Sequence, residues 1–235
     1  MFATTDHKTT ITDHLEELRQ RLFVCLAAVV IASIAGYFFV DHILEHLSRF
    51  AGPFVFLFPT EALMAKLKCA LYVGIFAALP VILFEIWQFI VSALTPREKK
   101  ALLWLVPFSY TLFCVGILFA YYVIIPQGTR FLLAHAEPYM QPFISVDRFL
   151  GFVVFLCVTF GFVFQIPVLV FFLTTMRLIT ASRLARSRKY VIVGIVIAAG
   201  VLTPGPDVFS QILMAVPTWL LFEMSVVIAR VVGRE

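Results

Sequence analysis

The chain has 235 residues, of which 62% are hydrophobic and 14% charged, and its formal net charge is +4. Its mean hydropathy is +1.00. Soluble domains carry about a quarter charged residues, so this composition excludes an ordinary soluble domain and predicts an all-α integral membrane protein. The net charge is modest, and we expect no nucleic-acid partner.

The charged segment 14–22, His-Leu-Glu-Glu-Leu-Arg-Gln-Arg-Leu, directly precedes the first long apolar run. Asp13 and Glu16 fit a helix N-cap with its N3 acid, and Glu17 and Arg21 have the i, i+4 spacing of a helical ion pair. A narrow apolar stripe runs alongside them, made of Leu15, Leu18 and Leu22. The segment could set topology, contact lipid headgroups or bind a polar partner. Anionic lipid would repel Glu16 and Glu17, so lipid contact does not explain these acids.

Six apolar runs are candidates for membrane-crossing helices. They cover residues 22–40, 66–93, 101–125, 149–175, 190–201 and 208–227. The first run ends in aromatic residues, so we expect a retained helix and not a cleavable signal peptide. The fifth run, of about a dozen residues, would be about 18 Å long. We therefore expect the last two helices to be a short hairpin that falls short of the far face or thins the bilayer.

Positive residues are distributed unevenly between the two sides of these spans. Thirteen of the 18 Lys and Arg residues fall on the side that holds both chain ends, and the other side holds Arg49, Lys66, Lys68, Arg130 and Arg148. Since cytoplasmic connections collect positive residues, both termini are predicted to be cytoplasmic. The two long extracytoplasmic connections, 41–65 and 127–147, are expected to fold as caps on the bundle.

Prolines and polar residues within the spans indicate how the helices pack. Each proline removes a backbone donor and kinks its helix, which favours a curved, concave bundle; the four are Pro80, Pro107, Pro167 and Pro217. Gln165 lies deepest among the polar groups and must find hydrogen-bond partners in the bundle interior. Glu85 and Glu223 lie nearer the cytoplasmic side, where interfacial or interhelical hydrogen bonding would explain them.

No residue pattern indicates catalysis. The five histidines lie outside the span interiors, and the sequence contains no nucleophile, zinc or phosphate-binding motif. The cysteines lack metal-ligand spacing and read as buried small hydrophobes; they are Cys25, Cys69, Cys114 and Cys157. We therefore predict no enzyme activity, no catalytic residue, no cofactor and no metal.

A second acid, Glu98, follows the second span. It completes a capping box with Thr95 and Pro96, and capping alone would account for it. Alternatively, Glu17 and Glu98 share one cytoplasmic surface with an apolar patch of Leu15, Phe89 and Leu94. Carboxylates beside such a patch suit a basic peptide with a hydrophobic continuation, because guanidinium groups pair with carboxylates.

Four segments resemble the TatC family of the twin-arginine protein translocase: 14–22, 89–98, 160–168 and 202–211. The resemblance implies a six-helix, glove-shaped receptor in the cytoplasmic membrane of a bacterium, an archaeon or an organelle. Such a receptor binds signal peptides with consecutive arginines and supports export of folded proteins by the proton-motive force. Implied partners are the single-span TatA and TatB subunits, membrane lipids and further copies of the chain in a larger complex.

Carried over by position, Glu17 and Glu98 would engage the two arginines. The same surface would include Leu15, Arg19, Phe89 and Leu94. Asp207 would lie at the short extracytoplasmic tip between the last two spans. The family commonly has an acid where this chain has Gln165, and it usually shows proline-glycine before the leucine at position 94.

The alternative function is a small-solute secondary transporter. A transporter predicts a polar pathway at the bilayer midplane and half-helices at matching places in two repeats. The sequence has one deep glutamine and no internal repeat, so it favours the receptor. A membrane enzyme ranks third, because no nucleophile and base are paired.

Overall fold

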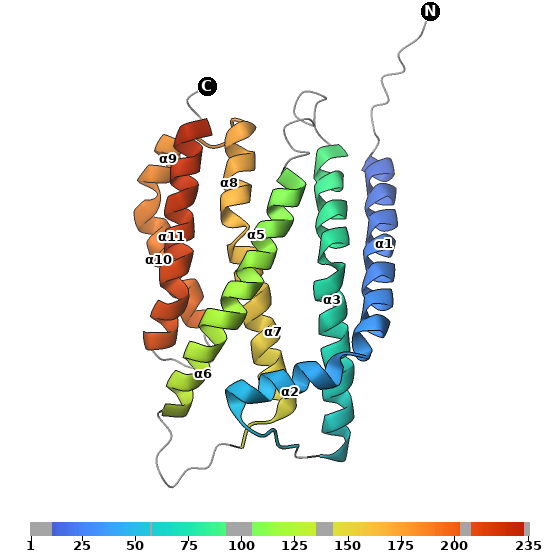
Figure 1. Cartoon of the computed structure of the whole chain (residues 1–235). Helices are drawn as coiled ribbons and strands as arrows, with labels where there is room; N and C mark the ends of the chain where they lie inside the picture. Colours follow the sequence, from blue (N-terminus) through green and yellow to red (C-terminus); the bar gives the residue numbers. More distant parts are fainter. Residues whose placement is uncertain (1–10, 57, 93–104, 135–142, 203–207, 233–235) are drawn as a thin grey trace, which may run out of the picture.

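The computed structural model describes residues 11–56, 58–92, 105–134, 143–202 and 208–232. Within these segments the fold is a bundle of upright helices, with one helix lying across an end (Figure 1). The helices are α1 (Ile11–Tyr37), α2 (Val40–Ala51), α3 (Pro59–Ser92), α5 (Leu105–Phe119), the π-helix η1 (Ala120–Ile124), α6 (Ile125–Ala134), α7 (Val146–Val163), α8 (Ile166–Thr175), α9 (Ala181–Arg186), α10 (Arg188–Leu202) and α11 (Val208–Val232).

The bundle has two ends, which we name after the short helices found there. At the α9 end, α1 begins, α3 and α8 end, and α11 ends (Figure 1). At the α2 end, α2 lies across the bundle, α3 and α7 begin, and α6 ends. The first and last described turns of the chain therefore lie at the same end.

Within the described segments, five helical stretches are long and apolar enough to cross a membrane: Leu15–Tyr37, Thr60–Phe89, Leu105–Ala134, Val146–Thr175 and Val208–Val231. They correspond to five of the six predicted spans. The sixth, α10, has 15 residues, or about 22 Å, and is short as expected. The prediction that the other helix of this hairpin is also short is wrong, because that helix, α11, has 25 residues. The helix also extends past residue 227, the end of the predicted run, as far as Val232.

The prolines predicted to kink the spans take different positions in the helices. Pro80 and Pro217 lie inside α3 and α11, which continue through them. Pro167 stands in the first turn of α8, directly after a break at Phe164–Gln165 that separates α8 from α7. The third span continues past residue 125, where it was predicted to end. Just before Pro126 the helix makes a π turn, in which the Ile125 amide donates to the Ala120 carbonyl, and this turn accommodates the proline.

The described parts of the two long connections pack together on the α2 end, as predicted. Within the first connection, α2 is a helix whose apolar side is buried. The Val55 amide donates to the Ile144 carbonyl at 3.1 Å, and the Ser145 hydroxyl donates to Glu61. These contacts join segments that are about 90 residues apart in the chain.

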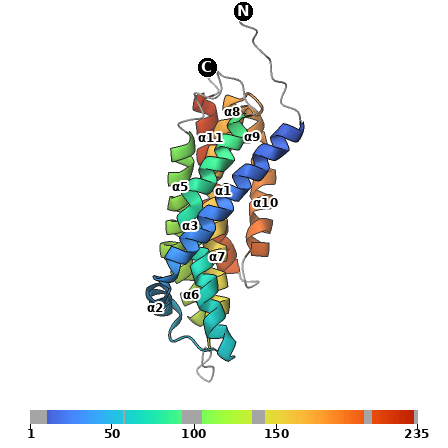
Figure 2. The ribbon, with the colours of Figure 1, turned by 90° about the vertical axis from the view of Figure 1, so that its right-hand side faces the viewer.

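Helix α1 lies at the edge of the bundle and packs on α3, which runs antiparallel to it (Figures 1 and 2). The two backbones approach closely at Gly74, where a Cβ would lie 2.6 Å from the Ser33 Cα. None of the residues 15–35, which form most of the apolar part of α1, is buried. Among the cysteines, Cys69 and Cys157 are buried as predicted, whereas Cys25 and Cys114 are only half-buried.

Candidate functional site

Three charged side chains from α1 and α3 meet near the α9 end. The Arg21 guanidinium donates to Glu17 Oε1 from Nη2 at 2.5 Å and from Nε at 3.1 Å. Its Nη1 donates to Glu85 Oε2 at 2.7 Å. The side chains of Arg21 and Glu85 are each 15% exposed, and that of Glu17 is 31% exposed. We call these three residues the Arg21 cluster.

The geometry of α1 and α3 explains the cluster. The i, i+4 spacing places Glu17 and Arg21 on one face of α1, as predicted. Antiparallel packing then sets Arg21 against Glu85, Ser33 against Gly74 and Gly36 against Val73. One turn nearer the α9 end, the same register places Phe89 level with Glu17. The helix crossing thus brings together residues that lie far apart in the sequence.

The other predicted site residues are only partly covered by the described segments. Leu15 is 60% exposed one turn from the start of α1. Phe89 lies half-buried near the end of α3. The Arg19 guanidinium lies 5.6 Å from the centre of the Phe23 ring. Glu98, Leu94 and Asp207 lie outside the described residues, so their roles stay predictions.

Sequence reasoning did not place Glu85 in the site, although it flagged this residue as an ionisable group within a span. That signal was sound, because a charge near hydrocarbon needs a partner. The partner, Arg21, is 64 positions away, and no local pattern pairs the two residues. Glu223 behaves similarly: its carboxylate accepts from Arg188 Nη2 at 2.7 Å and joins α11 to α10. The expected interhelical bonding is confirmed for both glutamates.

Gln165 has the interior partner that its depth requires. Ser109 Oγ donates to Gln165 Oε1 at 2.5 Å, and Gln165 Nε2 donates back to the Ser109 carbonyl at 3.1 Å. The pair links α5 to the break between α7 and α8. Because both groups are neutral and satisfy each other, this arrangement holds helices together and carries no charge.

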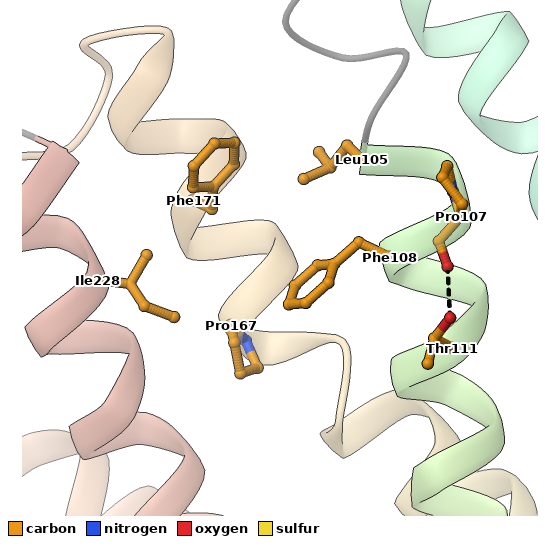
Figure 3. Close-up of a pocket in the computed structure, with 7 residues that line it drawn as sticks. All are labelled: Leu105, Pro107, Phe108, Thr111, Pro167, Phe171 and Ile228. Atoms are coloured by element: carbon orange, nitrogen blue, oxygen red, sulfur yellow. Dashed lines mark hydrogen bonds between the residues drawn. The ribbon is translucent and has the colours of Figure 1, made fainter.

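A cavity of about 580 Å³ is lined mainly by apolar side chains (Figure 3). Its lining comes from α5, α8 and α11: Leu105, Pro107, Phe108, Thr111, Pro167, Phe171 and Ile228. The Thr111 hydroxyl donates to the Pro107 carbonyl at 2.8 Å within α5. Among the lining residues that the structure describes, Thr111 carries the only polar side chain, and its hydroxyl already donates within its own helix.

At the α2 end, ion pairs tie the helices that meet there. Lys66 Nζ lies 2.6 Å from Asp41 Oδ1, and Lys68 Nζ lies 2.6 Å from Asp147 Oδ1. The lysine-bearing α3 is thereby joined to α2 and α7. In the part of the chain that the structure describes, no three His, Cys, Asp or Glu side chains are grouped to hold a metal ion.

Known protein sequences match this chain over nearly its whole length. Residues 13–217 match the sequence profile of the Sec-independent protein translocase protein (TatC). The Sec-independent protein translocase protein TatC of Carboxydothermus hydrogenoformans is 39% identical over 96% of this chain and 94% of that protein. The protein of the same name from Aquifex aeolicus is 36% identical, with 96% of each chain covered.

Solved structures agree as well. A crystal structure described as the twin arginine translocase receptor TatC matches with a TM-score of 0.79 and 36% identity, covering 94% of this chain and all of the other. A second structure of that receptor, in DDM, matches with a TM-score of 0.80 and 37% identity, covering 92% and 99% of the two chains. The chain therefore belongs to the TatC family, which makes it a multi-pass membrane component of Sec-independent, twin-arginine protein translocation and not an enzyme.

Proposed function

We propose that the chain is the receptor for signal peptides with consecutive arginines, and that Glu17 binds one of the two guanidinium groups. The supporting observation is the Arg21 cluster, in which one guanidinium lies between two carboxylates. The cluster therefore carries one net negative charge, and Glu17 is its most exposed member. A carboxylate that attracts and orients a guanidinium through paired N–H donors gives the chemistry that a twin-arginine motif needs.

The apolar surroundings of Glu17 suit the hydrophobic segment that follows the arginines in such a peptide. Leu15 is exposed on α1, and Phe89 of α3 is level with Glu17 in the helix register. Glu98 and Leu94, in the connection after α3, are expected to supply the second carboxylate and further apolar surface. Arg19 is expected at the margin of this surface.

The proposal requires the α9 end to face the cytoplasm. Positive charge among the described residues supports this orientation: the α9 end carries Arg19, Arg21, Arg177, Arg183, Arg186, Arg188, Lys189 and Arg230, against Arg49, Lys66, Lys68, Arg130 and Arg148 at the α2 end. With α10 as a short sixth span, the chain forms a six-helix, glove-like bundle with both termini cytoplasmic. Asp207 then lies at the extracytoplasmic tip between α10 and α11.

The receptor is expected to act within a larger complex. Partners are the single-span TatA and TatB subunits, membrane lipids and further copies of this chain, and export of folded cargo is driven by the proton-motive force. Co-purification of tagged TatA and TatB with this chain, but not with an unrelated multi-pass protein, tests the partner assignment.

Binding of a fluorescent twin-arginine peptide to the purified protein in nanodiscs tests the site. Glu17→Gln should weaken binding by about 10-fold or more at low salt, because hydrogen bonds to charged groups contribute roughly 1.5–3 kcal/mol. Glu16→Gln is the matched control, since it makes the same charge change on a neighbouring face of α1 and should change affinity little. Wild-type affinity should fall as salt rises. Normal binding by Glu17→Gln at low salt would refute the assignment.

A small-solute transporter is not favoured. The polar group deepest in the predicted spans, Gln165, is occupied by Ser109, and the family is one of protein translocases. A specific flux of a small ion or metabolite through liposomes containing this chain alone would reopen that alternative.

A further inference from the structure

We propose that Glu85 is a positioning residue for the peptide site: it holds the Arg21 guanidinium so that Glu17 keeps a negative charge for the arginine of the signal peptide. This inference rests on the proposed role of Glu17. It concerns a residue of α3 that lies beneath the peptide surface and would not itself touch the peptide.

The geometry of the cluster separates an inner pair from an outer carboxylate. Arg21 divides its donors between two helices, with Nη1 directed to Glu85 and with Nε and Nη2 directed to Glu17. Arg21 and Glu85 are each 15% exposed, whereas Glu17 is 31% exposed. An incoming peptide therefore reaches Glu17 first, with the Arg21–Glu85 pair behind it.

Arg21 carries the same chemical group as the proposed ligand, so it competes with the peptide for Glu17. The competition depends on what else Arg21 can bind. With Glu85 ionised, Arg21 keeps a carboxylate at 2.7 Å when it gives up Glu17. The exchange then leaves no buried guanidinium unpaired, which would be costly in a partly buried site.

Glu85 also sets the charge that the peptide meets. One guanidinium between two carboxylates leaves one net negative charge, whereas Glu85→Gln would leave a neutral pair of Glu17 and Arg21. In that variant Arg21 has no other anionic partner in the cluster and remains on Glu17. The peptide then has to displace an intact ion pair and gains no net attraction from it.

In the native protein, Arg21 therefore limits which cations can bind to Glu17. A ligand replaces Arg21 on Glu17 only if it supplies comparable planar, paired N–H donors, which guanidinium has and ammonium lacks. Arg21 thus excludes weakly bound cations from Glu17. A peptide with a guanidinium group can still bind, because Glu85 then takes over Arg21.

Peptide affinity in nanodiscs separates this role from a structural one. Glu85→Gln should bind the twin-arginine peptide on the order of 10-fold more weakly than wild type. The double variant Arg21→Gln/Glu85→Gln should return to within about threefold of wild type, because residue 21 no longer carries a guanidinium that competes for Glu17. Arg21→Gln alone should bind at least as tightly as wild type. Glu223→Gln is the matched control, since Glu223 pairs with Arg188 between other helices of the same end, and should leave affinity unchanged.

The outcomes distinguish this inference from the proposed function. If Glu85→Gln binds normally, or the double variant is as weak as Glu85→Gln, or Arg21→Gln loses affinity, the positioning role is wrong. The receptor site would still stand in each case, provided that Glu17→Gln is weak. Normal binding by Glu17→Gln would instead remove the site itself, and the role of Glu85 with it. Thermal denaturation of each variant verifies that the affinities compare folded proteins.

Discussion

Gly74 is the residue on which the packing of α1 most directly depends, and Gly74→Ala tests that dependence. A Cβ at this position would lie 2.6 Å from both the Cα and the backbone N of Ser33. Ordinary contacts of this kind lie near 3.5–4.0 Å, so the two helices must separate locally by about 1 Å. The substitution therefore acts on backbone, which cannot rotate out of the way.

The expected magnitude follows from two opposing effects. Glycine to alanine inside a helix stabilises by about 0.5–1 kcal/mol. Forcing a methyl group into a closely packed contact costs about 1–3 kcal/mol. Gly194→Ala is the matched control, because a Cβ there would meet no described heavy atom within 4 Å. Since both variants share the helix gain, Gly74→Ala should be less stable than Gly194→Ala by about 1–3 kcal/mol.

Thermal denaturation in detergent measures the difference, with about 2–4 °C expected for each kcal/mol in a chain of this size. Ser33→Ala/Gly74→Ala should not recover stability, because removing the Ser33 hydroxyl leaves the contact with its backbone. Equal stability of Gly74→Ala and Gly194→Ala would refute the reasoning, as would recovery in the double variant. Either result would mean that α1 does not rest on α3 at this glycine.

Three further predictions concern other contacts. Ser109→Ala should lower the free energy of unfolding by about 0.6–2 kcal/mol, because it leaves Gln165 without its hydroxyl partner. Ser109→Ala/Gln165→Leu should recover most of that loss in denaturation experiments, since removing both partners leaves fewer unsatisfied polar groups than removing one. A double variant less stable than Ser109→Ala would contradict this. Glu61→Ala should speed hydrogen exchange at the Val55 amide, which donates to Ile144 beside the Ser145–Glu61 contact, and unchanged exchange would separate the two contacts. A small maleimide in detergent should label the half-buried Cys25 and Cys114 before the buried Cys69 and Cys157. The reverse order of labelling would contradict the packing of these four side chains.

Much of the fold could be predicted from the sequence, because hydrocarbon imposes a simple rule on it. A span must be apolar for about 20 residues, so composition and run length identified five crossing helices and the short α10. Local spacing was equally informative at the start of α1. The i, i+4 relation of Glu17 and Arg21 requires no knowledge of other helices, and the ion pair is present.

Predictions were wrong for some helix ends and incomplete for a connection, because both depend on neighbouring structure. The third span was predicted to end at residue 125, yet a π turn carries it on to Ala134. The first long connection was predicted only to cap the bundle, and the structure adds that a helix, α2, forms within it with its apolar side buried. Runs of residues show where a helix is possible, whereas packing decides where it ends.

The sequence by itself determined the membrane class, the main spans, the family and the local pair of Glu17 with Arg21. Tertiary structure alone decided that Glu85 joins that pair and that Ser109 satisfies Gln165. Both links connect residues more than 50 positions apart. Their physical reason is the same: a polar group near hydrocarbon must be paired, but the partner is chosen by how two helices cross, and that crossing is set by contacts such as Gly74 on Ser33.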